Sequence, residues 1–299
     1  FVMREMTSGQ GGGYVASFSA VDGGGEEGGV YLWSIDELHA LLGERDTALA
    51  RRHWRMLDIP ILDGGHLPLR GEGPVQIAQQ TDQPEEAVRE RLEAIRSILL
   101  VARGERVLPV DGKVLAGWNG LMLAAMARAA REWQDPDLSR AATGIRNYLR
   151  ECLWDGSELR RAVAAGQPLG RASMEDYAYV AYGLAHYAEL SGDPTDKTSV
   201  AVLLNAAWQR FYGPDGGRRE ERPLIPGIGA EPAMPEGALP APSALLIRLA
   251  LRSDDPELVA RAGAAAELAR PWAQDEPFWY SGHHAALLDL LGLKAGSAQ

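Results

Sequence analysis

Nearly apolar stretches alternate along this chain with stretches of mixed polarity. In the apolar stretches, leucine, methionine, alanine and tyrosine recur at three- and four-residue spacing, which is typical of helices buried on most sides. The stretches that follow them carry more charge, as amphipathic helices with one face in water do. The pattern therefore predicts buried inner helices over four segments, Trp118–Trp133, Met174–Ser191, Pro242–Arg252 and His283–Leu291.

Three Asp-Pro dipeptides set the spacing of the remaining helices. They lie at Asp135, Asp193 and Asp255, which are 58 and 62 residues apart. The side chain of an aspartate at the N-cap accepts a hydrogen bond from a free backbone amide. A proline at the first helical position has no amide N–H that could be left unpaired. Each dipeptide is therefore expected to begin a more polar outer helix directly after an inner one.

A helix-helix-loop unit of about sixty residues predicts an all-α fold, an incomplete (α/α) toroid of helical hairpins with short β segments in the loops. A right-handed solenoid is the structural alternative. We expect a single domain over residues 1–299, with an irregular part over 1–83, hairpins over 84–292 and a tail over 293–299. The Gly-rich loop over 9–13 lacks a following lysine and helix, so it predicts a turn and not a phosphate-binding loop.

Composition narrows the classes of partner. The formal net charge of -11 and the pI near 5.1 argue against nucleic acid, because phosphate binding needs clustered basic side chains. The N-terminus has neither a basic segment nor a following apolar one, and no run of eighteen apolar residues occurs. These features predict no membrane association and a cytoplasmic location. Phe1 in place of a start methionine indicates a fragment or a processed product.

The single cysteine, Cys152, limits metal and redox chemistry. One thiol cannot form a disulfide framework or a multi-cysteine zinc site, and its apolar neighbours favour a buried thiol over a reactive one. Neighbouring histidines at 283 and 284 point about 100° apart on a helix and lack a metal-binding spacing. The sequence therefore predicts no metal and no cofactor.

If the inner helices run parallel, their N-termini and the loops that feed them share one mouth of the ring. Adjacent helices pack about 8–10 Å apart, so carboxylates on neighbours can reach the roughly 5–9.5 Å separations that glycosidases use. Asp111 with Glu175 or Asp176 is the predicted catalytic set. The alternative is helix capping, since acidic residues are common in a first helical turn and Ser173 with Asp176 fits that pattern.

Aromatic and polar side chains at the same mouth are candidates for substrate binding. A tryptophan can stack on a sugar face and an amide can bind hydroxyl groups, whereas the alternative for each of these residues is packing in the core. Glu236 and Ser243 also lie at this end, before or at the start of the third inner helix. The predicted substrate-binding residues are Trp118, Asn119, Tyr177, Trp279, Tyr280 and His283.

Four segments occur in an order that resembles one family. They are Ser19–Asp22, Glu26–Trp33, Lys113–Met122 and Met174–Ala178. In this order they resemble the C-terminal region of the thioredoxin-domain-containing proteins of the spermatogenesis-associated protein 20 family. The resemblance implies a six-hairpin glycosidase-like toroid, similar in shape to N-acylglucosamine 2-epimerases and unsaturated glucuronyl hydrolases. The chain departs from the family at Gly23–Gly25, at Gly112 and over Pro240–Ser243, and it has no CxxC motif.

Two functions follow as hypotheses. The first is a carbohydrate-active domain, hydrolase-like or epimerase-like, in which carboxylates perform acid/base chemistry on a sugar or a sugar-derived small molecule. The second is a non-catalytic binding or scaffold module that partners a thioredoxin-like domain, which the departures from the family pattern favour. An open cleft with exposed aromatic side chains would distinguish the first from the second.

Overall fold

A computed structural model describes residues 1–9, 11–56, 59–60, 62–223 and 225–296. The chain divides into two compact units. Unit 1 comprises Phe1–Ala16 with Gly112–Gln299, and unit 2 comprises Ser17–Asp111. The predicted boundary at residue 84 does not coincide with this division, and whether both units form one domain stays a prediction. Residues 297–299 of the predicted tail lie outside the described residues.

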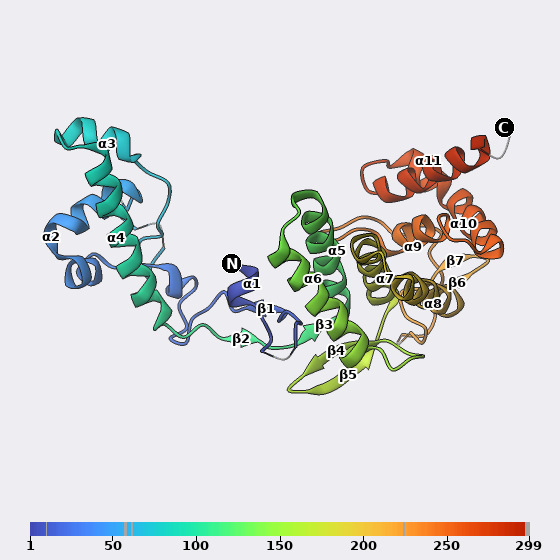
Figure 1. The fold of residues 1–299 in the computed structure, drawn as a ribbon. Helices are drawn as coiled ribbons and strands as arrows, with labels where there is room; N and C mark the ends of the chain where they lie inside the picture. The colour runs from blue at the N-terminus through green and yellow to red at the C-terminus, as the bar shows by residue number, and fades with distance from the viewer. Residues whose placement is uncertain (10, 57–58, 61, 224, 297–299) are drawn as a thin grey trace. The chain divides into compact units, whose positions relative to one another are not determined.

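Unit 1 is built from inner and outer helices that alternate along the chain (Figure 1). The inner helices are α5 (Ala116–Trp133), α7 (Met174–Ser191), α9 (Pro242–Ala250) and α11 (Ser281–Gly296). The outer helices are α6 (Pro136–Tyr148), α8 (Pro194–Phe211) and α10 (Pro256–Asp275). Helices α5, α7 and α9 each pack on the next inner helix and on the outer helix of their own hairpin, and α11 packs on α9 and α10. The predicted fold class, an incomplete (α/α) toroid of helical hairpins with short β segments, is confirmed.

Every outer helix begins as the Asp-Pro spacing predicts. Asp135 Oδ1 accepts hydrogen bonds from the amides of Asp137 and Leu138, at 2.8 and 3.1 Å. Asp193 and Asp255 cap α8 and α10 in the same way. Because each cap satisfies amides that have no partner inside the helix, these starts are determined locally.

Inner helices α5 and α7 run parallel and very close together. A Cβ added at Gly120 would lie 2.5 Å from the carbonyl carbon and oxygen of Tyr179, and one added at Gly183 would meet the carbonyl of Gly120. At the far ends, Arg131 forms an ion pair with Glu189. These contacts join residues 58 to 63 positions apart, which is close to the period of the Asp-Pro dipeptides.

Helices α9 and α11 are parallel as well. The hydroxyl of Ser243 lies 2.8 Å from Nε2 of His283, and Arg248 bonds to Asp289 at 2.8 Å. Both contacts join residues about forty positions apart, in the same direction along each helix. The neighbouring inner helices of each pair thus begin at a common end, as the predicted mouth requires.

Short strands precede the first two inner helices. A three-stranded antiparallel sheet contains β3 (Val114–Leu115), β4 (Arg160–Ala164) and β5 (Gln167–Arg171), in that order. Strand β3 runs directly into α5, and β5 is followed by α7. The strands β6 (Tyr212–Gly213) and β7 (Gly216–Gly217) form a hairpin after α8. The sheet therefore lies at the N-terminal ends of α5 and α7.

The N-terminal segment of unit 1 contains the short helix α1 (Val2–Glu5) and then lies against α5 and α6. The side chain of Asn119 accepts from the amide of Tyr14 at 2.9 Å and donates to its carbonyl at 3.0 Å. A Cβ at Gly12 would lie 2.5 Å from the backbone of Gly144. The side chain of Asn119 thus bonds to both backbone polar groups of Tyr14, as a neighbouring β-strand would.

Unit 2 has its own helices and its own core. Its elements are β1 (Ser17–Phe18), η1 (Gly29–Tyr31), α2 (Ile35–His53), α3 (Pro74–Thr81), α4 (Glu85–Gly104) and β2 (Val110–Asp111). Strands β1 and β2 pair antiparallel. Ser34 caps α2 by accepting a hydrogen bond from the amide of Glu37 at 3.1 Å. Leu38 and Ile95 are fully buried between α2 and α4.

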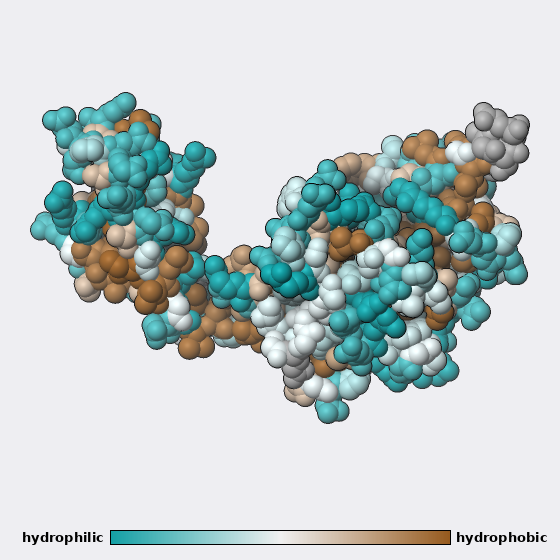
Figure 2. Space-filling model, viewed as in Figure 1, coloured by the Kyte–Doolittle hydropathy of each residue, from teal (hydrophilic) through white to brown (hydrophobic). Residues whose placement is uncertain are grey.

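The surface of unit 1 leaves part of the last inner helix uncovered within the described residues. Leu288 and Leu291 on α11 are exposed. Figure 2 shows hydrophobic side chains gathered over this helix. In the part of the chain that the structure describes, no helix is both long and apolar enough to span a bilayer.

Candidate functional site

A cavity of about 360 Å³ opens at the N-terminal ends of α5 and α7. We call it the mouth pocket. Its lining combines an aromatic side chain, both charge signs and a buried tyrosine, and includes Trp118, Arg161, Glu175, Asp176, Tyr179, Arg219 and Glu220. Three of these, Trp118, Glu175 and Asp176, are among the residues that the sequence predicts for the site.

Separate elements bring the charged side chains of the mouth pocket together. Glu175 and Asp176 lie in the first turn of α7, and Arg161 comes from β4. Arg219 lies in the loop after β7, and its carbonyl accepts from the amide of Met174 at 2.9 Å. This backbone bond holds the loop against the start of α7, so the guanidinium of Arg219 stays near the carboxylates.

The carboxylate of Asp176 joins the starts of two inner helices. Oδ1 accepts from the amide of Gly117 on α5 at 3.2 Å, and Oδ2 accepts from the amide of Ser173 at 2.9 Å and from its hydroxyl at 3.0 Å. Burial raises the pKa of Asp176, while these bonds and Arg161 at 3.4 Å oppose the rise. These are the contacts that the alternative of helix capping predicts. A catalytic role for Asp176 stays a prediction.

Glu175 is the more accessible of the two carboxylates. Its side chain is 48% exposed, and Oε1 lies 3.7 Å from Nη1 of Arg219. Arg219 bonds more closely to Glu231, at 2.8 Å. Because the nearer carboxylate already occupies Arg219, Glu175 is held only loosely and keeps oxygens available to a ligand.

Trp118 provides the aromatic surface of the mouth pocket. It lies in the first turn of α5 and is 48% exposed. The side chains of Arg161 and Glu220, joined by a hydrogen bond of 2.7 Å, lie in the lining of the same pocket. An exposed indole beside such groups offers a flat apolar face together with donors and acceptors.

Asn119 and Tyr177 are buried away from the mouth pocket. The amide of Asn119 is engaged by Tyr14 and also donates to the carbonyl of Leu115 at 2.9 Å. The hydroxyl of Tyr177 accepts from the amide of Leu159 at 3.0 Å, and its ring packs edge-on against Phe211. The hydrogen bonds and ring contacts given for these two side chains are with other residues of the protein, as the alternative of packing in the core predicts.

The candidates near the start of α11 do not line the mouth pocket. Trp279 is exposed and stands edge-on to Phe278. Tyr280 is half-buried, and His283 is fully buried beside Ser243. Burial lowers the pKa of His283 to about 4, so this imidazole is neutral at physiological pH.

Asp111 belongs to unit 2. It pairs with Ser17 where β2 meets β1. Glu175 and Asp176 belong to unit 1, so the pairing of Asp111 with either of them stays a prediction.

Arg161, Arg219 and Glu220 are site residues that no sequence pattern indicates. They come from a short strand and an irregular loop, segments without the periodicity that predicts the helices. For Glu236, the sequence predicts a place near the mouth but no function. In the structure, Glu236 accepts from the amide of Ala241 at 2.6 Å and from that of Gly282 at 2.8 Å, so it joins the starts of α9 and α11. This repeats the arrangement of Asp176 on α5 and α7.

The sequence predicts a buried thiol, but Cys152 is exposed in the structure, so that prediction is wrong. Among the described residues, no three side chains of His, Cys, Asp or Glu converge in a way that could hold a metal ion. The mouth pocket instead pairs carboxylates with arginines.

Known proteins support the predicted resemblance. No protein-family model matches the chain. The chain is similar to spermatogenesis-associated protein 20. It is 25% identical to the mouse protein, 26% to the rat protein and 27% to the human protein, over 222 residues in each comparison. Each match covers 64% of this chain and 28% of the relative, so the chain spans under a third of the length of these relatives.

Among solved structures, the chain overlaps cellobiose 2-epimerase from Spirochaeta thermophila DSM 6192. The TM-score is 0.42 at 20% sequence identity, and the overlap covers 53% of this chain and 43% of the epimerase. An overlap this limited does not establish a shared activity.

Proposed function

We propose that unit 1 is a carbohydrate-active toroid domain that binds a sugar or a sugar-derived small molecule in the mouth pocket. The observation that carries this proposal is the exposed indole of Trp118 in a pocket with Glu175 and Arg219. The apolar face of a sugar ring can stack on the indole, while its hydroxyl groups bond to the carboxylate and the guanidinium.

Glu175 is the proposed acid/base residue. Its half-exposed carboxylate can accept or return a proton, whereas both oxygens of Asp176 already hold helix starts together. An epimerase-like reaction needs a base that removes a proton and an acid that returns one. A hydrolase-like reaction needs a second carboxylate, for which Glu220 in the same pocket is the candidate.

Ligand binding tests the first part of this proposal. We expect Trp118→Ala to weaken binding of a sugar by about tenfold, the loss expected for one aromatic contact. The matched control is Trp133→Ala, since Trp133 is exposed at the opposite end of the same helix. Calorimetric titration with neutral hexoses, N-acetylhexosamines and hexuronates measures the difference. Equal weakening by both variants would contradict stacking at Trp118.

Turnover tests the second part. Glu175→Gln keeps the shape of the side chain but removes its ability to transfer a proton. For any sugar that the protein converts, we expect binding to persist and the rate to fall by about 100-fold or more. A variant that loses binding and keeps its rate would rule out Glu175 as the acid/base residue.

The second candidate function is a non-catalytic module that partners a thioredoxin-like domain. The pairing of charges in the mouth pocket favours it, because Arg161 holds Asp176 and Glu220, and Arg219 holds Glu231. Failure of every sugar in the titration panel to bind would select this candidate over the first.

A further inference from the structure

A second cavity, of about 270 Å³, lies on the outer side of unit 1. We call it the outer groove. Its lining comes from the segment 149–159 that follows α6, from α7 and from α8. It shares no lining residue with the mouth pocket. Its floor consists of buried aliphatic side chains, Leu149, Leu159, Val180, Leu184 and Leu203.

The groove begins where α6 changes its geometry. Helix α6 continues as a turn of π-helix, η2 (Leu149–Leu153), before the chain leaves the helix at Trp154. A π-turn is wider than an α-turn and occurs often at functional sites. Leu149 and Trp154, at either end of this turn, both line the groove.

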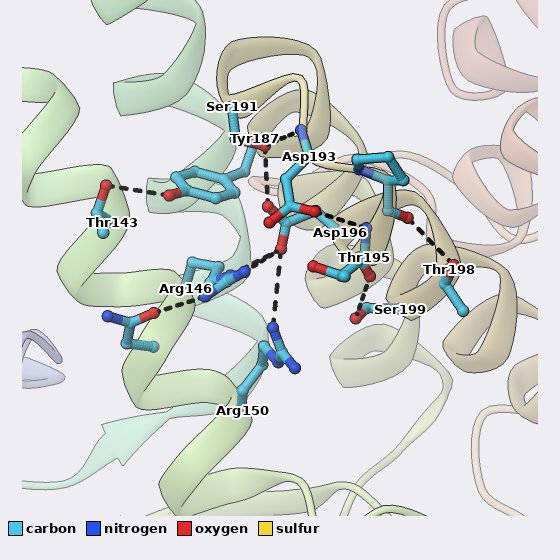
Figure 3. Close-up of polar contacts among 12 residues, drawn as sticks. Thr143, Arg146, Arg150, Tyr187, Ser191, Asp193, Thr195, Asp196, Thr198 and Ser199 are labelled. Atoms are coloured by element: carbon cyan, nitrogen blue, oxygen red, sulfur yellow. Dashed lines mark hydrogen bonds and ion pairs between the residues drawn. The ribbon is translucent and has the colours of Figure 1, made fainter.

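A network of ion pairs lies next to the groove. Asp196 at the start of α8 is 1% exposed, and its Oδ1 accepts from Nε of Arg146 at 2.8 Å. Its Oδ2 accepts from the hydroxyl of Ser191 at 2.8 Å (Figure 3). Arg150 lies farther away, with Nη1 at 3.9 Å from the carboxylate. Arg146 forms the closer pair with Asp196, and Arg150 is the charged side chain in the lining of the groove.

The guanidinium of Arg150 is accessible to a ligand, because its side chain is 41% exposed. The rim hydroxyls of Thr198 and Ser199 donate to the carbonyls of their own helix, at 3.1 and 2.9 Å (Figure 3). Because both hydroxyl protons are already donated to backbone carbonyls, an anionic head group would bind to Arg150.

We propose that the outer groove binds a small amphipathic anion. Its carboxylate pairs with Arg150, and its apolar chain lies on the aliphatic floor. The cavity of about 270 Å³ has room for a chain of several carbons, as a medium-chain carboxylate has. Arginine suits this head group because its planar fork can form two parallel bonds to a carboxylate.

Titration of the whole chain with octanoate tests this proposal. We expect saturable binding that Arg150→Gln weakens by about tenfold, as expected for the loss of a charge-assisted bond. The control is Arg140→Gln, since Arg140 lies on the same helix in an exposed pair with Asp137. A second variant, Val202→Asp, places a negative charge at the exposed rim and should also weaken binding.

Two further probes separate the head group from the chain. Octylammonium carries the opposite charge and octanol carries none, so both should bind the unmodified protein more weakly than octanoate. Arg150→Gln should remove that preference while its thermal midpoint stays within a few degrees of the original. Octanoate binding that is non-saturable, equal to octanol binding or unchanged in Arg150→Gln would overturn the proposal.

Discussion

Asp193 and Asp196 lie one helical turn apart at the start of α8, yet their carboxylates are in different environments. Asp193 is partly exposed and accepts from the amide of Thr195 at 2.8 Å, as an N-cap does. Asp196 is buried and holds Arg146 and Ser191 (Figure 3). Burial and partners, more than residue type, therefore decide what each carboxylate contributes.

This difference predicts unequal losses of stability. Asp193→Ala removes one cap and should lower the free energy of unfolding by about 1 kcal/mol. Asp196→Ala leaves the largely buried guanidinium of Arg146 without its partner, so the loss should be about 3–5 kcal/mol. Urea unfolding of the two variants measures both values. Similar losses would mean that the Asp196 pair contributes no more than a cap.

His283 predicts a pH dependence of stability. Its pKa is lowered from 6.5 to about 4 in the folded protein, so the folded state resists protonation. The stabilisation from the neutral imidazole is complete above pH 6.5 and is lost as the pH falls toward 4. Between pH 7.5 and pH 5, the loss should be about 2 kcal/mol, at about 1.4 kcal/mol per pH unit below 6.5.

Urea unfolding at these two pH values checks the His283 prediction. His283→Gln places an amide near the position of Nε2, where it can hydrogen-bond to Ser243, but it cannot titrate, so it serves as the reference. The protein should lose about 2 kcal/mol more than this variant between the two pH values. An equal loss in both would show that other groups cause the pH dependence.

At the scale of elements, neighbouring inner helices are joined by the same two means. A carboxylate connects the helix starts, Asp176 for α5 and α7 and Glu236 for α9 and α11. Close packing or polar pairs then hold the helices along their length, through Gly120 and Gly183 in the first pair. The carboxylates also benefit from the positive potential at helix N-termini.

Gly120 therefore predicts a strong response to a single methyl group. Gly120→Ala would place its Cβ 2.5 Å from the backbone of Tyr179, so α5 and α7 must separate. Overpacking of this kind should cost about 3 kcal/mol. Gly292→Ala on α11 is the control, because its Cβ would meet no atom within 4 Å, and it should be neutral or stabilising. Thermal unfolding compares the two, and equal midpoints would contradict the close packing.

At the scale of the whole molecule, the two units have separate hydrophobic cores. Ile95 and Leu38 are fully buried in unit 2, and Leu123 and Ile145 are fully buried in unit 1. Cores that share no residue can unfold separately.

Calorimetry of the full chain should therefore resolve two transitions. Ile95→Ala should lower only the transition of unit 2 and Leu123→Ala only that of unit 1, with about 2–5 kcal/mol lost in each case. A single transition that both variants lower equally would show that the units unfold together.

Local patterns account for most of the helical architecture. The Asp-Pro starts, the apolar inner segments and their spacing near sixty residues predict the hairpins and the common mouth, because caps and periodicity act within a few residues. The resemblance found in four short segments was confirmed by the similarity to spermatogenesis-associated protein 20. These features needed no knowledge of which residues meet across the fold.

The composition of the site was decided by tertiary structure. Arg161 and Arg219 reach the mouth pocket from a strand and a loop without periodicity, while Asn119 and His283 turn into the protein to bond with Tyr14 and Ser243. A sequence pattern places a residue near a helix start, but its exposure depends on contacts with segments tens of residues away. Burial and hydrogen bonding across those contacts are properties of the packed chain, so the printed sequence alone does not reveal them.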